Sequence, residues 1–437
     1  GMYETLYKAY SSSKYYGAGG YLNPHYTLAN SQMANPNLKW ETTITRNGGL
    51  DFGFLHERIS GTLDFYWNTT KDLLMKTEIP SNTGYSYQYQ NFGKTSNKGV
   101  ELTLNAVLAD KAKWGLNFNF NISYNRNRID ELSTENPWQS SNWSGSTIAK
   151  YEDYRVEEGG RLGEIWGYKT NGFYTAYDPV TNPNGELVLN GTSWELREGI
   201  KDNSYSMAGG KPYPGQLKYE CDENGNPIKQ KLGNTVAPLT GGFGFDGFIG
   251  NFDFNIFFNY SVGNQIVNGT KLANSFCAGS AKGYNLVNDF ALDNRYTWID
   301  PETGLNLGKP SSSTVDYYGG AEGLIARLNA LNTGANIYNP AAVTAMYLND
   351  YAVEDASFLR VNNITIGYTF PKAWVKKAFM QNVRIYVTGY NLYCLTSYSG
   401  PDPEVDTSSK KNAMTPGIDY AAYPKSRSFV AGINVTF

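Results

Sequence analysis

Apolar and polar residues alternate with a period of two in many short stretches of this chain. The clearest is NFNFNISYNRNR, residues 117–128, in which Phe118, Phe120, Ile122 and Tyr124 alternate with polar residues. Successive side chains of a β-strand point to opposite faces, so this stretch predicts a strand with one apolar face and one amide-rich face. The question that follows is whether the apolar face contacts a protein core or lipid.

Similar patterns recur along the chain and predict roughly ten or eleven strands in all. The other stretches are 38–54, 58–70, 72–79, 99–108, 163–175, 239–250, 251–266, 358–370, 382–393 and 428–437. Some connections are tight, at 55–58, 109–113 and 249–251, and others are long, at 129–162, 176–236, 267–356 and 394–427. Tight turns at one end and long loops at the other are typical of antiparallel, up-and-down barrels of the outer membrane.

Three features favour lipid over a protein core. The strands run for about 12 to 17 residues, more than the roughly 9–11 that cross a bilayer. Their polar face is rich in Asn, Ser and Thr, which suits a water-filled lumen. Aromatic residues concentrate near strand ends, where an interfacial girdle would lie; they include Trp40, Tyr66, Trp67, Trp114, Tyr124 and Tyr260. Alternation alone leaves open a soluble all-β sandwich, so that reading remains the alternative.

Composition narrows the function classes. The chain has 437 residues and a net charge of −3, from 37 basic and 40 acidic residues, which gives no electrostatic case for nucleic acid. His25 and His56 are its two histidines, and its three cysteines lack CxxC spacing. Because there is no GxSxG, HExxH or P-loop motif and no carboxylate pair with a predicted common site, we expect no enzyme, no metal centre and no cofactor.

The start of the chain carries its own expectation. Gly1 precedes Met2, as it does after removal of an affinity tag, so we expect a piece of a longer protein. The lack of a recognisable signal peptide then carries no information on location.

Two features of the predicted loops are candidate binding sites. Asp222, Asn224 and Asn226 keep three oxygen positions of a calcium hand, but Pro227 and Gly233 replace the turn glycine and the bidentate Glu, so a hairpin turn is the better interpretation. Aromatic residues in the loops are candidates for contact with substrate, although packing within the loops is the more ordinary role for such rings. These candidates are Trp138, Trp143, Trp194, Tyr205, Tyr213 and Tyr398.

Several long stretches resemble one family. Residues 28–74, together with NFGKTSNKGVELTLNA (91–106), resemble the barrel of SusC/RagA-like TonB-dependent outer-membrane transporters. Residues 163–175 and 238–268 match further blocks of that family, and DASFLRVNNITIGYTFP (355–371), residues 383–405 and 423–437 match its C-terminal end. The resemblance covers nearly all of the chain after residue 28.

The resemblance implies a fold and a role. The family's barrel has about 22 strands around an N-terminal plug, so residues 1–437 would be the C-terminal portion of the barrel, without the plug and the first strands. The parent protein would import glycan or peptide fragments across the outer membrane. Its partners would be a SusD-like lipoprotein, TonB through the missing N-terminal part, outer-membrane lipid, and an oligosaccharide or peptide substrate. The alternative is a soluble all-β cell-surface glycan-binding protein.

The last residue has a role of its own in this interpretation. Phe437 ends an alternating apolar row, and the resemblance, like outer-membrane proteins generally, implies that the barrel-assembly machinery recognises such a terminal aromatic residue.

Overall fold

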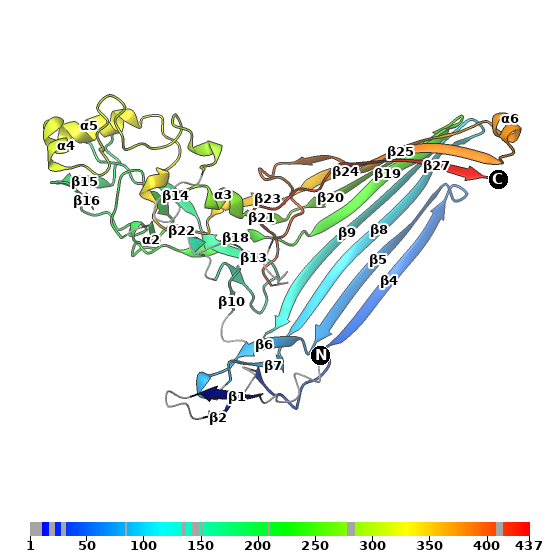
Figure 1. Ribbon diagram of the computed structural model, residues 1–437, viewed down its shortest axis with the longest axis horizontal. Helices are drawn as coiled ribbons and strands as arrows, with labels where there is room; N and C mark the ends of the chain where they lie inside the picture. Colours follow the sequence, from blue (N-terminus) through cyan, green and yellow to red (C-terminus); the bar gives the residue numbers. More distant parts are fainter. Residues whose placement is uncertain are drawn as a thin grey trace.

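The dominant feature of the computed structural model is one antiparallel sheet of nine strands, in the order β27-β25-β24-β20-β19-β9-β8-β5-β4 (Figure 1). The structure describes residues 11–16, 22–27, 32–83, 85–132, 137–141, 143, 148–149, 152–208, 210–277, 285–407 and 414–437. The nine strands are β4 (Thr42–Phe54), β5 (Ile59–Lys71), β8 (Lys94–Lys111), β9 (Trp114–Glu131), β19 (Leu239–Ile249), β20 (Phe252–Val262), β24 (Phe358–Thr369), β25 (Asn382–Thr396) and β27 (Ser428–Thr436). Each strand pairs with its neighbours in chain order, as an up-and-down barrel predicts.

Register places the alternating residues of neighbouring strands in common rows. Leu50, Leu63, Leu102 and Ile122 lie side by side across β4, β5, β8 and β9. The next row along these strands, on the opposite face, joins Asp51, Thr62, Thr103 and Asn121. A shift of one residue would exchange the two faces, so the alternation in the sequence also determines the register.

The connections follow the expected asymmetry. Residues 55–58, 112–113, 250–251 and 370–381 join strands at one end of the sheet, and the long loops emerge at the other (Figure 1). The turn after β4 is tight: Leu55, His56 and Glu57 all have positive φ values, near 60°. The segment 370–381 holds α6 (Lys372–Val375) and η6 (Lys376–Ala378).

Two of the stretches predicted as strands lie outside this sheet. Residues 72–79 contain β6 (Leu74–Glu78), which pairs with β7 (Tyr87–Asn91). Residues 163–175 are divided into β13 (Glu164–Tyr168) and β14 (Thr170–Phe173), with an irregular register at Ile165 and a positive φ at Gly172. The two breaks prevent residues 163–175 from forming one long strand. Both 72–79 and 163–175 belong to small sheets at the loop end.

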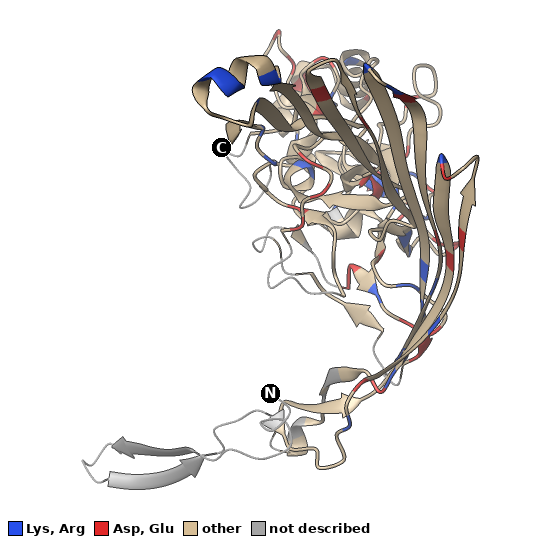
Figure 2. Ribbon diagram, turned by 90° about the vertical axis from the view of Figure 1, so that its right-hand side faces the viewer, with Lys and Arg blue, Asp and Glu red and all other residues tan. Residues whose placement is uncertain are grey.

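The nine-stranded sheet is open. Within the described part of the chain, β4 pairs only with β5 and β27 pairs only with β25. Figure 2 shows the sheet bent into a trough. No helix of the described residues has the length and apolar character needed to cross a membrane.

The loops form a folded region of their own, built from short elements. Its remaining strands are β10 (Trp138–Gln139), β11 (Ile148–Ala149), β12 (Tyr154–Arg155), β15 (Leu187–Asn190), β16 (Ser193–Leu196), β17 (Leu217–Tyr219), β18 (Lys229–Asn234), β21 (Gln265–Asn268), β22 (Met346–Tyr347), β23 (Val353–Asp355) and β26 (Ile418–Asp419). Its helices are α2 (Tyr205–Ala208), α3 (Gly269–Ala273), η3 (Asn288–Phe290), α4 (Ser312–Tyr317), α5 (Ala321–Leu331), η4 (Pro340–Ala342) and η5 (Asp350–Ala352). At the N-terminal side, β1 (Ser11–Tyr16) pairs with β2 (Leu22–Thr27), β3 (Gln32–Met33) pairs with β7, and η1 is Ser81–Thr83.

Two apolar cores hold this loop region together. One surrounds Tyr154, Tyr219 and Leu272, and the other surrounds Tyr174, Leu307 and Leu324; all six residues are fully buried. The sheet itself has no comparable core, since these clusters lie in the loops. The apolar side of α5 packs into the second core.

Candidate functional site

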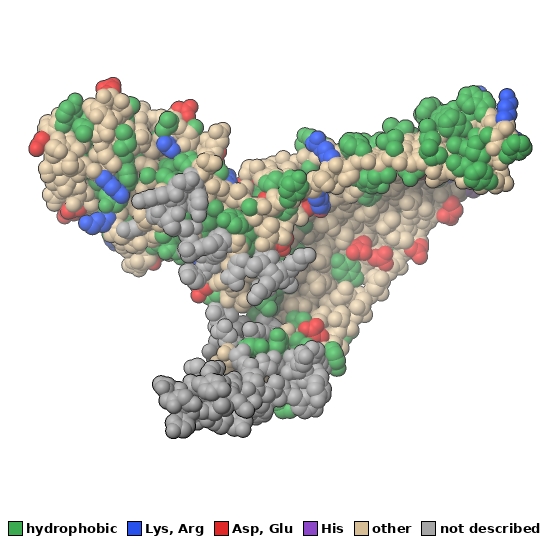
Figure 3. Space-filling model, viewed as in Figure 1, with side chains coloured by type: hydrophobic (Ala, Val, Ile, Leu, Met, Phe, Trp, Pro, Cys, Tyr) green, Lys and Arg blue, Asp and Glu red, His purple; other side chains and the backbone are tan. Residues whose placement is uncertain are grey.

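The polar face of the sheet forms the first candidate surface. A hollow of about 660 Å³ on this face is lined by Thr45, Asn47, Asp64, Tyr66, Asn68, Asn97, Glu101 and Asn125. The Tyr66 hydroxyl donates to Asn125 Oδ1 across 3.1 Å, and Ser123 Oγ donates to Glu101 Oε1 across 3.1 Å. In Figure 3 the face of β4, β5, β8 and β9 turned to the viewer is mostly uncharged and polar, with some acidic side chains. This wall offers many hydrogen-bonding groups to a hydrated solute.

The opposite face of the sheet is apolar and uncovered. Phe65, Phe252, Phe429 and Ile433 expose 54, 57, 72 and 67% of their surface, respectively. A soluble sandwich would bury such a row beneath a second sheet. Trp67 and Tyr124 lie toward the loop end of this face and Trp114 toward the turn end, as expected for two aromatic girdles. Tyr66, which was predicted for the same girdle, lies instead on the polar face, because it directly precedes the outward Trp67 in the strand.

A second hollow lies where the sheet meets the loops. Its volume is about 460 Å³, and it is lined by Thr235, Ala237, Thr240, Gly241, Asn259, Tyr260, Ser261, Asn264, Phe358, Pro403 and Glu404. The segment GPDPEV supplies its last two residues and is held by Arg360 of β24, which pairs with Asp402 at 2.7 Å and with Glu404 at 2.9 Å. No pattern in the sequence links Arg360 to this segment, residues 400–405. Ion pairing therefore fixes these two carboxylates.

A third, smaller hollow lies inside the loop region. It has a volume of about 140 Å³ and is lined by Glu152, Asp153, Trp166, Gly167, Tyr168, Lys229, Tyr347 and Leu348. Beside it, Trp138 and Trp166 meet edge to face with ring centres 5.5 Å apart. Arg155 lies over both rings, at 5.1 and 4.7 Å from their centres. These contacts link β10, β12 and β13 into one aromatic and charged unit.

Asp153 is the buried acid of that unit. Its side chain is 2% exposed, accepts the Ser141 backbone N–H at 2.7 Å, and also accepts the Ser141 hydroxyl. Burial raises the pKa of Asp153 to about 6, although the Ser141 hydrogen bonds and the charge of Lys229 act in the other direction. Asp153 therefore has a pKa of about 6, and its hydrogen bonds with Ser141 join the segment after β10 to the segment before β12.

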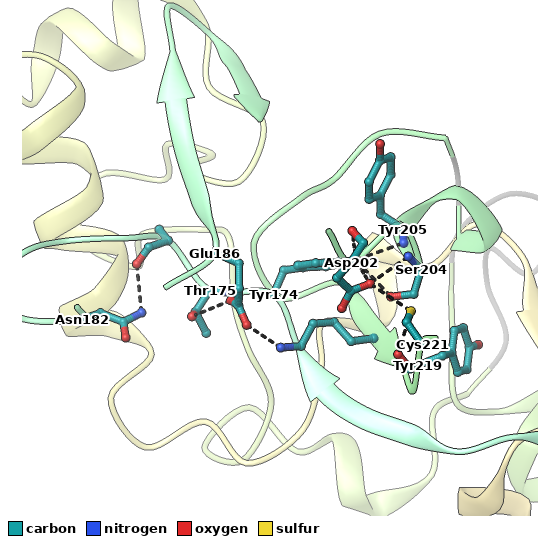
Figure 4. A network of polar contacts seen from close by, with 11 residues as sticks. Tyr174, Thr175, Asn182, Glu186, Asp202, Ser204, Tyr205, Tyr219 and Cys221 are labelled. Carbon is teal, nitrogen blue, oxygen red and sulfur yellow. Dashed lines mark hydrogen bonds and ion pairs between the residues drawn. The ribbon is translucent and has the colours of Figure 1, made fainter. Parts of the chain in front are cut away.

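A polar network links the loop cores to the hairpin at residues 217–230 (Figure 4). The Tyr174 hydroxyl donates to Asp202 Oδ1 across 2.7 Å and lies 3.0 Å from Ser204 Oγ. Burial raises the pKa of Tyr174 well above its ordinary value. Burial, with the neighbouring charge of Asp202, raises the pKa of Cys221 to about 11, so its thiol stays protonated at neutral pH. The network is structural and shows no nucleophile.

The six loop aromatics proposed as binding residues have different surroundings. Trp143 and Trp194 are buried in the two cores, and the indole of Trp194 donates to the Gly308 carbonyl at 3.0 Å. Tyr398 is 5% exposed and donates its hydroxyl to Asp419 at 2.7 Å. The structure thus shows packing for these three residues.

The other three candidates are partly exposed. Lysine or arginine side chains lie over the rings of Trp138 and Tyr213, with Lys229 at 4.7 Å and Lys309 at 4.6 Å from the respective ring centres. Tyr205 meets Tyr174 edge to face at 6.3 Å. Substrate contact by Trp138, Tyr205 and Tyr213 stays a prediction.

The calcium-like segment has a structural explanation. Asp222 Oδ1 accepts the backbone N–H groups of Asn224 and Asn226, at 2.9 and 2.8 Å, and closes the predicted hairpin turn. Among the described residues, no group of three or more His, Cys, Asp or Glu is placed to hold a metal ion.

Phe437 lies directly after β27, at the end of the sheet where the tight turns lie. Its side chain is 80% exposed. The preceding Thr436 accepts the backbone N–H of Gln381 at 2.7 Å. The terminal ring is thus presented at a fixed position beside the turn 370–381.

Comparison with known proteins agrees with this geometry. The family model for the β-barrel of TonB-dependent receptors matches residues 3–208. The chain is 29% identical to TonB-dependent receptor P3 of Formosa agariphila over 93% of its length, and 28% identical to the TonB-dependent receptor SusC of Bacteroides thetaiotaomicron over 94%. It spans only about a third of these relatives, 35 and 34% of their length.

Solved structures show the same fold. The RagAB peptide importer in its open-open state matches 99% of the chain with a TM-score of 0.66 and 20% sequence identity, and the chain covers 38% of that protein. The nine-stranded sheet is therefore part of a larger barrel. The chain is therefore similar, in sequence and in fold, to part of the β-barrel of TonB-dependent receptors such as SusC.

Proposed function

We propose that this chain is the C-terminal half of an outer-membrane importer that carries glycan or peptide fragments and is driven through TonB. The observation that supports this most is the division of the sheet into two faces. One face is hollow and lined by amide, hydroxyl and carboxylate groups; the other is apolar and uncovered. A wall of this kind separates a water-filled lumen from lipid.

In this proposal the parts of the chain have separate roles. The loop end faces the outside, and its cores form a rigid platform for a SusD-like lipoprotein that delivers substrate. The polar wall lines part of the passage, while a plug and the TonB-contacting segment belong to the remainder of the parent protein. Tyr205 is the best placed of the partly exposed loop aromatics to stack on a substrate, because a cation already lies over the rings of Trp138 and Tyr213.

Uptake by cells that carry the full-length receptor tests the proposal. Cells whose receptor gene is deleted would be complemented with the wild type or with an Asn97→Arg/Asn125→Arg variant, which adds bulk and charge inside the hollow. We expect uptake of labelled oligosaccharides or oligopeptides to require the gene and to fall severalfold in the variant, at an unchanged receptor level in the outer membrane. Gln substitution of Lys111 and Lys113, which are exposed at the turn end, is the matched control.

Two results would overturn the proposal. Uptake of both cargo classes that is unaffected by gene deletion would exclude the transport role. Recovery of the receptor in the soluble fraction would instead favour a cell-surface binding protein. Co-purification of a lipoprotein of the SusD type with the tagged receptor is the direct test of the partner.

A further inference from the structure

Cationic side chains gather at the loop end of the apolar face of the sheet. One row across four strands joins Arg46 of β4, Trp67 of β5, Lys98 of β8 and Arg126 of β9. In the next row on the same face, Arg128 of β9 lies opposite Ser96 of β8. Lys98, Arg126 and Arg128 are exposed. Basic residues are thus concentrated on the side that faces away from the polar hollow.

Their position follows from the strand pattern. On β9 the outward residues are apolar from Trp114 to Tyr124, and Arg126 is the next outward residue beyond Tyr124. At about 3.3 Å per residue and a tilt of about 40°, this stretch spans roughly 25 Å, the height of the apolar band of an outer-membrane barrel. The cations therefore lie directly above the band, at the level where lipid headgroups begin.

The cations are poorly neutralised by the protein. Lys98 and Arg126 lie directly opposite each other, an arrangement of like charges that destabilises a sheet. Neither forms an ion pair with an acidic residue of the described chain; the Lys98 ammonium lies over the Trp67 ring at 4.4 Å. Arg128 approaches Asp130 only at 3.9 Å, and Glu131 is paired with Lys94 at 3.0 Å.

The same residues border a hollow. Its volume is about 300 Å³, and it is lined by Ser96, Lys98, Arg126, Asn127, Arg128, Gly159 and Arg161. Arg161 enters from the loop that follows β9, and its buried Nε finds no hydrogen-bond partner among the described residues. Four cationic side chains thus line a space large enough for a phosphate group, while the Ser96 hydroxyl at its wall donates to Asp130 Oδ1 across 3.0 Å.

We infer that this hollow binds the phosphorylated headgroup of a lipid in the membrane leaflet on the loop side. The inference rests on the proposed location of the sheet in the outer membrane. Phosphate oxygens would accept hydrogen bonds from the guanidinium groups, which suit phosphate geometry, and would separate the opposed charges of Lys98 and Arg126. The acyl chains would lie along the row of Phe65, Val100 and Tyr124 directly below.

The geometry argues against a soluble anion as the natural ligand. The site opens on the face opposite the polar hollow, so a substrate in the lumen does not pass it. Trp67 and Tyr124, exposed by 48 and 46%, are placed as amphipathic rings are at the membrane interface. A lipid neutralises the cations and also covers the neighbouring apolar row, whereas a free phosphate only neutralises the cations.

Lipid binding to the full-length receptor in detergent tests the inference. The probes are lipid A with its phosphates, the same lipid after removal of both phosphates, and inorganic phosphate, each followed by native mass spectrometry or by titration. The test variant is Lys98→Gln/Arg126→Gln/Arg128→Gln. The control, Lys111→Gln/Lys113→Gln/Lys377→Gln, makes the same change in charge at the turn end of the sheet. Heat-modified mobility on gels confirms that each variant has folded.

We expect the wild type and the control to bind phosphorylated lipid A alike, and the test variant to bind it about 100-fold more weakly, from the loss of three cations. Removal of the phosphates should weaken binding to the wild type by a similar factor. Equal binding of the phosphate-free lipid, equal binding by the test variant, or competition by inorganic phosphate at millimolar concentration would each overturn the inference. Uptake measured on the same variants separates this outcome from failure of the transport proposal.

Discussion

Arg360 on β24 donates to Asp402 across 2.7 Å, and the two side chains are only 5 and 3% exposed. This ion pair joins a strand of the sheet to the loop that follows β25. Removing one partner of a buried pair typically costs about 3–5 kcal/mol when the other charge is left uncompensated, but Arg360 would keep Glu404 as a second, more exposed partner. Asp402→Ala should therefore lower the free energy of unfolding of this rim by up to that amount, measured by thermal denaturation or by proteolysis within residues 397–427.

A neighbouring ion pair provides the control. Lys425 pairs with Glu404 at 2.7 Å, but the two side chains are 44 and 26% exposed. Exposed pairs contribute about 0–1 kcal/mol, so Lys425→Gln should have a small effect. If Asp402→Ala were as mild as Lys425→Gln, the ion pair would not be what holds this segment.

The two faces of β9 predict opposite responses to the same substitution. Phe120 lies near the middle of the apolar face, and its neighbour in sequence, Asn121, lies on the polar face. An arginine at the bilayer midplane of a barrel costs about 2–4 kcal/mol, whereas an arginine in the lumen is hydrated. Phe120→Arg should lower the amount of folded receptor in the outer membrane strongly, and Asn121→Arg should leave it nearly unchanged, as measured by heat-modified mobility. Equal loss for both variants would contradict the assignment of the faces.

The sequence alone predicts the strands and their faces, but not the contacts of the loops. Alternation identified the nine strands of the sheet and their two faces, because a buried or lipid-exposed face imposes a period of two. Their up-and-down order followed from the tight and long connections. It could not identify Arg360 as the partner of Asp402, since 42 residues separate them and either could be a solvated charge. It also could not separate buried Trp194 from partly exposed Tyr205, because loop packing has no period. Extending the alternation of β9 beyond Tyr124 would have shown that Arg126 and Arg128 face outward.

The raised pKa of Asp153 should make the stability of the loop region depend on pH. The pKa of Asp153 is raised from 3.8 to about 6 by burial. Below about pH 3.8 the carboxyl group is protonated in both folded and unfolded states and has no differential effect. As the pH rises to about 6, the unfolded state loses the proton first, so the folded loop loses roughly 3 kcal/mol of stability.

Hydrogen exchange of residues 152–168 between pH 4 and pH 7, corrected for intrinsic rates, measures this effect. Asp153→Asn keeps an acceptor for the Ser141 N–H but has no proton to lose, so it should remove the pH dependence. Glu152→Gln, at the exposed neighbour, should retain it. A wild-type loop whose protection is constant across this range would disprove the assignment.

Substitution of Phe437 should impair assembly of the barrel. We predict that the machinery that inserts barrels recognises the ring of Phe437, which is exposed beside the turn end of the sheet. Phe437→Asp in the full-length receptor should reduce its level in the outer membrane severalfold, measured by membrane fractionation. Phe379→Asp is the matched control, because Phe379 is 93% exposed in the turn at the same end of the sheet but lies outside the strands. Normal membrane levels of the Phe437 variant would exclude the role.

The two longest loops are closed at their bases. Thr235 N donates to Gly163 O across 2.9 Å next to the paired strands β13 and β18, and Ala356 N donates to Asn264 O across 2.9 Å next to β21 and β23. The cost in chain entropy of closing a loop grows only slowly with its length. Because the base of each loop is already paired, the residues beyond the base add little to the entropy cost of pairing the strands that the loop connects. Because both apolar cores combine residues of the two loops, the loops would be exchanged together between related receptors at these two bases, so that recognition diverges while the barrel stays the same.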